Sequence, residues 1–129
     1  RRCCASEGTE VGTWGTQPKD NDETEDAFAK VAAASASSVD KLYRASFSRD
    51  AQKRWVRLGV LQMFIDGMPA AVAFLDSGTL QAAVYDAEDL LEDNDWLDTW
   101  KYGSARSVSS VKASLRSLAT RIRHIQLKR

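Results

Sequence analysis

VSSVKASLRSLATRIRHI, residues 108–125, is the stretch that indicates the fold most clearly. Its apolar residues recur in alternating steps of three and four, at Val108, Val111, Leu115, Leu118, Ile122 and Ile125. This spacing places them along one face of an α-helix, which has 3.6 residues per turn. The face covers about two and a half heptads, which is shorter than an independent coiled coil needs. We therefore predict a helix over about 104–127 that packs within a helical bundle.

Three further helices are predicted before this one. Their expected ranges are about 22–47, 50–66 and 69–92. The first begins with acidic residues and ends with basic ones, which suits the charges at the two ends of a helix. Ser48 or Asp50 is expected to cap the second helix. Gly67 fits the left-handed position after its end, and Pro69 fits the first turn of the next helix, so we expect a short turn and antiparallel neighbours.

Each predicted helix has a stripe of residues on one face that is expected to pack on its neighbours, and the stripes differ in the size of their side chains. The first stripe is interrupted by alanine and serine, so its helix should approach its neighbours closely. Its positions are Phe28, Val31, Ser35, Val39 and Leu42. The second stripe is wide enough to predict almost complete burial of the second half of its helix. It consists of Ala51, Trp55, Leu58, Gln62 and Ile65, widened by Val56, Val60, Met63 and Phe64. In the third helix, Gly78 is expected to break or kink the chain.

The first 20 residues have no apolar periodicity and predict an extended arm. They contain Gly8, Gly12, Gly15 and Pro18. Trp14 is the large apolar residue of this arm, and it either packs back on its own domain or anchors in a pocket of a partner. The predicted fold class is all-α, an up-and-down four-helix bundle over residues 21–129 with an extended N-terminal arm over residues 1–20.

Charge is balanced in total but unevenly distributed. The 129 residues include 18 basic and 18 acidic side chains, a balance that does not favour nucleic-acid binding. Residues 76–101 hold eight acids and one lysine, whereas residues 102–129 hold seven bases and no acid. Opposite charges help neighbouring helices to pair, and charges left free attract partners. We expect the bases between Arg106 and Arg116 to be used inside the domain. The bases expected to contact a partner are Arg121, Arg123, Lys128 and Arg129.

An aromatic segment links the third and last predicted helices. Trp96, Trp100 and Tyr102 lie within residues 94–103. We expect them to be buried as a plug at one end of the bundle, with a ligand platform as the alternative. If the charged residues do not carry docking, Trp96 and Trp100 are the predicted apolar contact with a partner.

Motifs for catalysis or metal binding are missing from the sequence. His124 is the only histidine, and Cys3 and Cys4 are the only cysteines. A zinc site built from these three residues would need carboxylates to complete it. The acidic run over residues 86–98 lacks the glycine and glutamate that an EF-hand requires. No nucleotide-binding or metalloprotease motif is present. The sequence therefore predicts a protein that is not an enzyme, with no cofactor, no metal and no small-molecule substrate.

Two segments resemble the PsbQ family of extrinsic photosystem II subunits. LQAAVYDAEDLLED (residues 80–93) is similar to the family's third helix, and KYGSARSVSSVKASL (residues 101–115) is similar to a final helix that opens at a tyrosine. Tyr102, Val108, Val111 and Leu115 carry this likeness. The resemblance implies a four-helix, non-enzymatic protein of the thylakoid lumen that docks on a membrane complex and stabilises it.

These observations together predict an accessory subunit that binds subunits of a larger organellar membrane complex. The resemblance favours a photosynthetic complex in the chloroplast thylakoid, and a respiratory complex in the mitochondrion is the alternative. The sequence also allows peripheral contact with a membrane surface, since anionic lipid headgroups attract the terminal bases. The alternative function is a small regulatory or nucleic-acid-binding module that uses Lys53, Arg54, Arg57 and the terminal bases.

Overall fold

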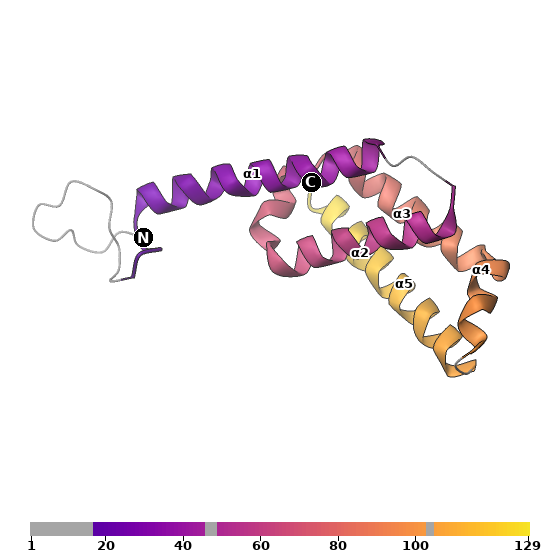
Figure 1. Ribbon diagram of the computed structural model, residues 1–129. Helices are drawn as coiled ribbons and strands as arrows, with labels where there is room; N and C mark the ends of the chain where they lie inside the picture. Colours follow the sequence, from indigo (N-terminus) through magenta and orange to yellow (C-terminus); the bar gives the residue numbers. More distant parts are fainter. Residues whose placement is uncertain (1–16, 46–48, 103–104) are drawn as a thin grey trace, which may run out of the picture.

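The structure, a computed structural model, describes residues 17–45, 49–102 and 105–129, and these are helical with no β-strand (Figure 1). Three of its four long helices, α1, α2 and α5, lie close to the predicted ranges. In chain order the elements are α1 (Asp22–Ala45), α2 (Ala51–Gly67), the 3-10 helix η1 (Pro69–Phe74), α3 (Ser77–Glu92), α4 (Asn94–Asp98), the 3-10 helix η2 (Thr99–Tyr102) and α5 (Ala105–Leu127). The all-α fold class is therefore confirmed. The predicted arm falls mostly on residues 1–16, including Trp14, which lie outside the described residues.

Helix α3 is the centre of the packing. It contacts α5 most extensively and also packs against α2, α1 and α4. Its side chains Leu80, Ala83, Ala87 and Leu90 are at most 1% exposed. On α5, the predicted stripe from Val111 to Ile122 is buried at every position, as the periodicity predicts. The pairing of the acidic third helix with the basic last helix is thus confirmed.

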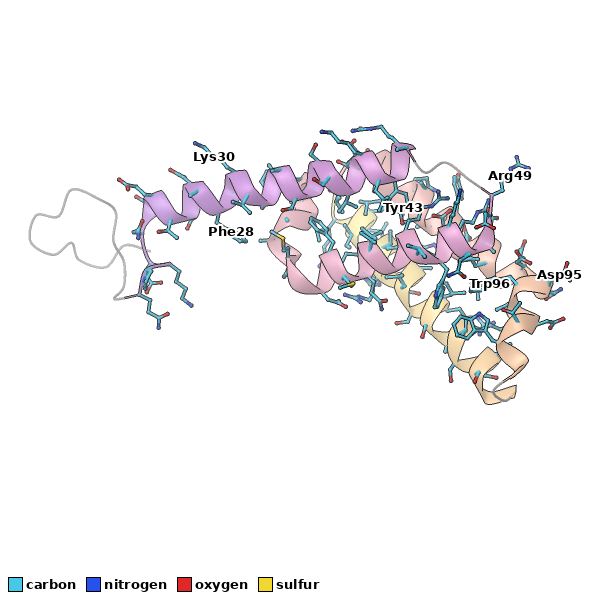
Figure 2. All side chains as sticks on the ribbon, viewed as in Figure 1. Phe28, Lys30, Tyr43, Arg49, Asp95 and Trp96 are labelled. Atoms are coloured by element: carbon cyan, nitrogen blue, oxygen red, sulfur yellow. The ribbon has the colours of Figure 1, made fainter. Side chains whose placement is uncertain are left out.

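Only the part of α1 from Ala32 onward belongs to the core. Its N-terminal half projects beyond the other helices, with Phe28 and Lys30 on the projecting part (Figures 1 and 2). Phe28 is 48% and Val31 is 55% exposed, so the expectation that this part of the stripe is buried is wrong. No described element covers that half, because α1 packs on η1, α2 and α3 through its later turns. The buried α1 residues are Ala32, Ala36, Val39, Asp40 and Tyr43.

The predicted helix over 69–92 is in fact two helices. The chain is extended at Leu75, between η1 and α3, and Asp76 takes the N-cap position of α3. The Asp40 carboxylate accepts hydrogen bonds from the Asp76 backbone N–H at 3.1 Å and from the Thr79 hydroxyl at 2.6 Å. A buried carboxylate needs such partners, and the break in the helix frees the Asp76 backbone N–H to be one of them. The break is therefore fixed by α1 and not by Gly78.

Capping sets the limits of α2. The Asp50 side chain accepts from the Lys53 backbone N–H at 3.0 Å, which confirms Asp50 as the cap. At the other end, the Met68 N–H bonds to the Phe64 carbonyl at 2.8 Å. Gly67 is the last residue of the helix and is not left-handed, contrary to the sequence-based expectation.

A buried ion pair joins α2 to α3. Arg57 donates two hydrogen bonds to the Asp86 carboxylate, from Nε at 2.5 Å and from Nη2 at 2.6 Å. These hydrogen bonds raise the pKa of the Arg57 guanidinium above its ordinary value. The guanidinium also lies 5.5 Å from the centre of the Tyr43 ring. Arg54 pairs with Asp89 at 2.5 Å at the edge of this network.

Burial and the nearby Asp86 charge raise the pKa of Tyr43 far above its ordinary value of 10.0. The unfolded phenol loses its proton near pH 10 while the folded one keeps it, so the free energy of unfolding falls as the pH rises further. Between about pH 10 and 11 we expect a loss of about 1 kcal/mol that Tyr43→Phe removes. Urea unfolding at each pH measures it. Equal losses in both proteins would contradict the proposed cause.

Candidate functional site

A cavity of about 330 Å³ opens between α2 and α5, two helices that do not pack closely against each other. We call it the α2–α5 groove. Its lining residues are Gln52, Trp55, Val56, Leu58, Gly59, Gln62, Ser114, Leu115 and Leu118. Leu58 and Leu115 are each 1% exposed and belong to the core, so the groove has an apolar floor. Its remaining polar side chains are two amides and a hydroxyl, which carry no charge.

Exposed apolar residues extend the groove along the outer face of α2. Val56, Val60 and Met63 are 54%, 37% and 76% exposed. They are spaced four and three residues apart, and therefore form one ridge along the helix. The prediction that the second half of this helix is almost fully buried is wrong. Core contacts occupy only the other face, which holds Leu61, Phe64 and Ile65.

Trp55, which lines the groove, packs against two further tryptophans. The Trp55 ring lies 5.3 Å from that of Trp96 and 5.5 Å from that of Trp100, centre to centre. Trp96 and Trp100 are themselves 5.9 Å apart, and α4 carries Trp96 on the same side of the molecule as the start of α2 (Figure 2). All three are half-buried, which supports the predicted plug. The sequence did not indicate that Trp55 joins it.

An ion pair of Arg121 joins α5 to α2 beyond the groove. The guanidinium donates to Asp66 of α2 at 2.6 Å, one turn beyond Gln62 and Leu118. Both partners are about half exposed, so the ion pair contributes little to stability.

Most of the terminal bases expected to contact a partner are bonded within the domain. Arg123 donates to Glu88 at 2.8 Å. Arg129 donates to the backbone carbonyls of Val72 at 2.8 Å and Leu75 at 2.6 Å. Arg121 is paired as well, and the exposed Lys128 side chain alone among the four has no partner in the described part of the chain.

The expected division of the α5 bases is therefore wrong for most of them, although Lys128 is unpaired as expected and the side chain of Arg106 lies outside the described part of the chain. Lys112 and Arg116 were expected to be used internally, and neither makes an ion pair within residues 17–45, 49–102 and 105–129. The terminal bases are bonded because the C-terminal end of α5 lies beside η1, α2 and α3. Acidic side chains of α2 and α3 and backbone carbonyls near η1 accept hydrogen bonds from these bases there. Two bases of the alternative function are also bonded within the domain, since Arg54 binds Asp89 and Arg57 binds Asp86, while Lys53 is exposed.

The described residues hold neither a metal site nor a membrane span. The described residues contain no group of three His, Cys, Asp or Glu side chains placed to hold a metal ion. Each helix in the described ranges is too short or too polar to cross a membrane. Comparison with known proteins finds no matching family, no matching curated protein and no matching solved structure.

Proposed function

We propose that this protein is a non-catalytic accessory subunit that docks on a larger complex by accepting an amphipathic helix of a partner protein in the α2–α5 groove. One observation carries the proposal. The exposed apolar ridge of Val56, Val60 and Met63 lies on α2 beside the apolar groove between α2 and α5. Exposed apolar surface of this kind marks sites of protein interaction.

The shape and chemistry of the groove specify a helix as the occupant. Its walls are two helices held apart, which is the arrangement into which a third helix packs. The α2 ridge presents Val56, Val60 and Met63 at helical spacing, so a partner helix needs apolar anchors at matching steps. Because Gln52, Gln62 and Ser114 are uncharged, the flanks of that helix should be polar and neutral.

The arrangement of the helices and the N-terminal arm is part of the same proposal. We infer that α1, α2, α3 and α5 form an up-and-down four-helix bundle and that residues 1–20 act as an arm. In this arrangement Trp14 supplies a second anchor on the partner, and Trp96 and Trp100 support the groove wall through Trp55. The terminal arginines then contribute by positioning α5, with Lys128 as the base that remains for the partner or a membrane surface.

The resemblance of residues 80–118 to the PsbQ family favours a photosynthetic membrane complex as the host. This places the proposed site of action at the lumenal face of the chloroplast thylakoid. A respiratory complex in the mitochondrion remains the alternative host. Both hosts require the same docking surface, so the identity of the complex can be tested separately from the groove.

Gly59 offers a matched pair of variants for the test. A Cβ atom at Gly59 would meet nothing within 4 Å, and the residue lies within a helix. Gly59→Ala is therefore expected to raise the free energy of unfolding by about 0.5–1 kcal/mol. Gly59→Leu should fold equally well, but its side chain fills part of the groove. Urea unfolding measures the first effect, and an unchanged or lower stability would contradict the open environment of Gly59.

Association is measured with the same variants. We expect the tagged full chain carrying Gly59→Ala to recover one defined complex from cells of its source. The chain carrying Gly59→Leu should recover at least about tenfold less of that complex, which corresponds to a loss of about 1.4 kcal/mol in binding free energy. Equal recovery by the two variants would contradict docking in the groove.

A further inference from the structure

Helix α1 carries an uncharged face along almost its whole length, which we call the α1 face. An α-helix turns by about 100° per residue, so residues three, four or seven positions apart share one side. The eight charged residues of α1 all lie outside one such side, which runs for about 32 Å. The α1 face consists of Thr24, Ala27, Phe28, Val31, Ala34, Ser35, Ser38, Leu42 and Ala45.

The α1 face is largely open to solvent. Phe28 and Val31 are 48% and 55% exposed, and the three alanines of the face are exposed as well. Ser35 and Leu42 are half-buried. Figure 2 shows Phe28 and the charged Lys30 on opposite sides of the helix. Since α1 packs on its own domain through a neighbouring side, the α1 face is left without a cover in the described part of the chain.

Two of the three hydroxyl groups on this face are already satisfied. The Ser38 hydroxyl donates to the Ala34 carbonyl at 3.2 Å, and the Thr24 hydroxyl donates to the Pro18 carbonyl at 2.9 Å. Covering the face therefore leaves neither of these donors without an acceptor. The small side chains in its middle also let a second helix approach closely. Both properties suit the face to packing against another helix.

Charged residues border one edge of the α1 face in an ordered sequence of signs. Glu23, Asp26, Lys30 and Lys41 are spaced three, four and eleven residues apart, so they follow the same edge. The two acids come first along the helix and the two bases follow. None of the four makes an ion pair within the segments that the structure describes. This edge is therefore complementary to a copy of itself that runs in the opposite direction.

We propose that the α1 face binds the same face of a second copy of this chain, with the two α1 helices antiparallel. This arrangement places Asp26 beside Lys41 of the second copy, and two-fold symmetry repeats the pair. A parallel arrangement would place each of these residues beside its own equivalent, and like charges repel. The α1 face shares no residue with the lining of the α2–α5 groove, so this inference does not rest on the proposed function.

The same register matches large side chains with small ones. When Asp26 lies beside Lys41, Phe28 lies opposite Ser38 of the second copy, and Val31 lies opposite Ser35 of the second copy. Side chains pack closely where helices meet, so a large side chain needs a small one across from it. The order of the charges and the sizes of the side chains therefore agree on one register.

Sedimentation equilibrium of the full chain measures this pairing at concentrations from about 1 μM to 1 mM. We expect a monomer–dimer equilibrium with no larger species, because the contact is symmetric and closed. Val31→Arg places a charge in the middle of the α1 face and should weaken the dimer at least about tenfold. Ala29 is also exposed but lies on the opposite side of the helix, so Ala29→Arg should stay within about twofold of wild type.

Two results of this measurement would overturn the proposal. The first is a full chain that stays monomeric over the whole range. The second is a dimer that Val31→Arg weakens no more than Ala29→Arg does.

Charge reversal tests the antiparallel arrangement. Lys41→Glu and Asp26→Lys each place like charges together twice per dimer, and each should weaken it at least about tenfold at low ionic strength. Both side chains are exposed, so these variants should fold normally. Combining the two substitutions restores opposite charges and should return the dissociation constant to within about threefold of wild type. A double variant that pairs no more tightly than the single variants would contradict the antiparallel pairing.

Gly59→Leu separates this dimer from docking in the α2–α5 groove. The substitution fills the groove and leaves the α1 face unchanged, so the variant should form the dimer as the wild type does. Loss of the dimer in Gly59→Leu would place the second copy in the groove and would overturn the assignment to α1.

Discussion

Asp86→Ala is expected to lower the free energy of unfolding by about 3–5 kcal/mol, the usual cost of breaking a buried ion pair from one side. Arg57 is 6% exposed, and it loses both of the hydrogen bonds that Asp86 accepts. The guanidinium stays charged because its pKa is far above neutral, so a buried cation is left without its partner. Urea unfolding followed by circular dichroism measures the change.

Two comparisons show whether the ion pair itself is the cause. Arg57→Met combined with Asp86→Leu removes both charges and should recover most of the loss. Arg44→Ala breaks the exposed pair with Asp76, in which both side chains are more than half exposed, and should cost less than about 1 kcal/mol. If Asp86→Ala costs no more than Arg44→Ala, the pair does not hold α2 to α3 as described.

Leu115→Asp is expected to cost at least about 4 kcal/mol and to unfold the protein or leave it loosely packed. Leu115 is 1% exposed in the middle of the α5 stripe, so the new carboxylate would lie in the core without a partner. Thermal melting followed by circular dichroism tests this result. Ser117→Asp changes an exposed residue of the same helix and should shift stability by less than about 0.5 kcal/mol. A normal melting temperature for Leu115→Asp would contradict the packing of α5 on α3.

Periodicity predicted α5 well and α1 poorly, for a physical reason. The steps of three and four from Val111 to Ile122 describe a face, and α5 buries that face along α3. Phe28 and Val31 continue an equally regular face on α1, but no described element lies opposite them. The spacing of residues defines which of them share a face. It does not define how far along the helix the neighbours extend.

Interactions between distant residues were the part that sequence patterns could not supply. The break before α3 depends on Asp40, which lies 36 residues before Asp76. The partners of Arg121 and Arg123 likewise depend on which helix lies beside the end of α5. The acidic and basic segments did predict that α3 and α5 are neighbours, because such a prediction needs only their net charges.

The candidate groove has a weak sequence signal. Val56, Val60 and Met63 have the same apolar character as buried residues, so hydropathy assigned them to the core. Gly59 was the one residue that could have indicated the groove. Glycine within a helix lowers the stability of the helix, so its presence there suggests a packing or functional reason. The structure provides open space at this position.

Site-specific photo-crosslinking is the most direct test of docking in the α2–α5 groove. A photoreactive benzoylphenylalanine replaces Met63 in one full-length variant and Tyr85 in another, since both side chains are exposed but lie on different faces. We expect the Met63 variant to crosslink to an amphipathic helix of one partner subunit, the Tyr85 variant to give no such product, and Gly59→Leu to abolish the Met63 crosslink. A partner that crosslinks from Tyr85 and not from Met63, or a Met63 crosslink that Gly59→Leu leaves intact, would contradict the proposed docking site.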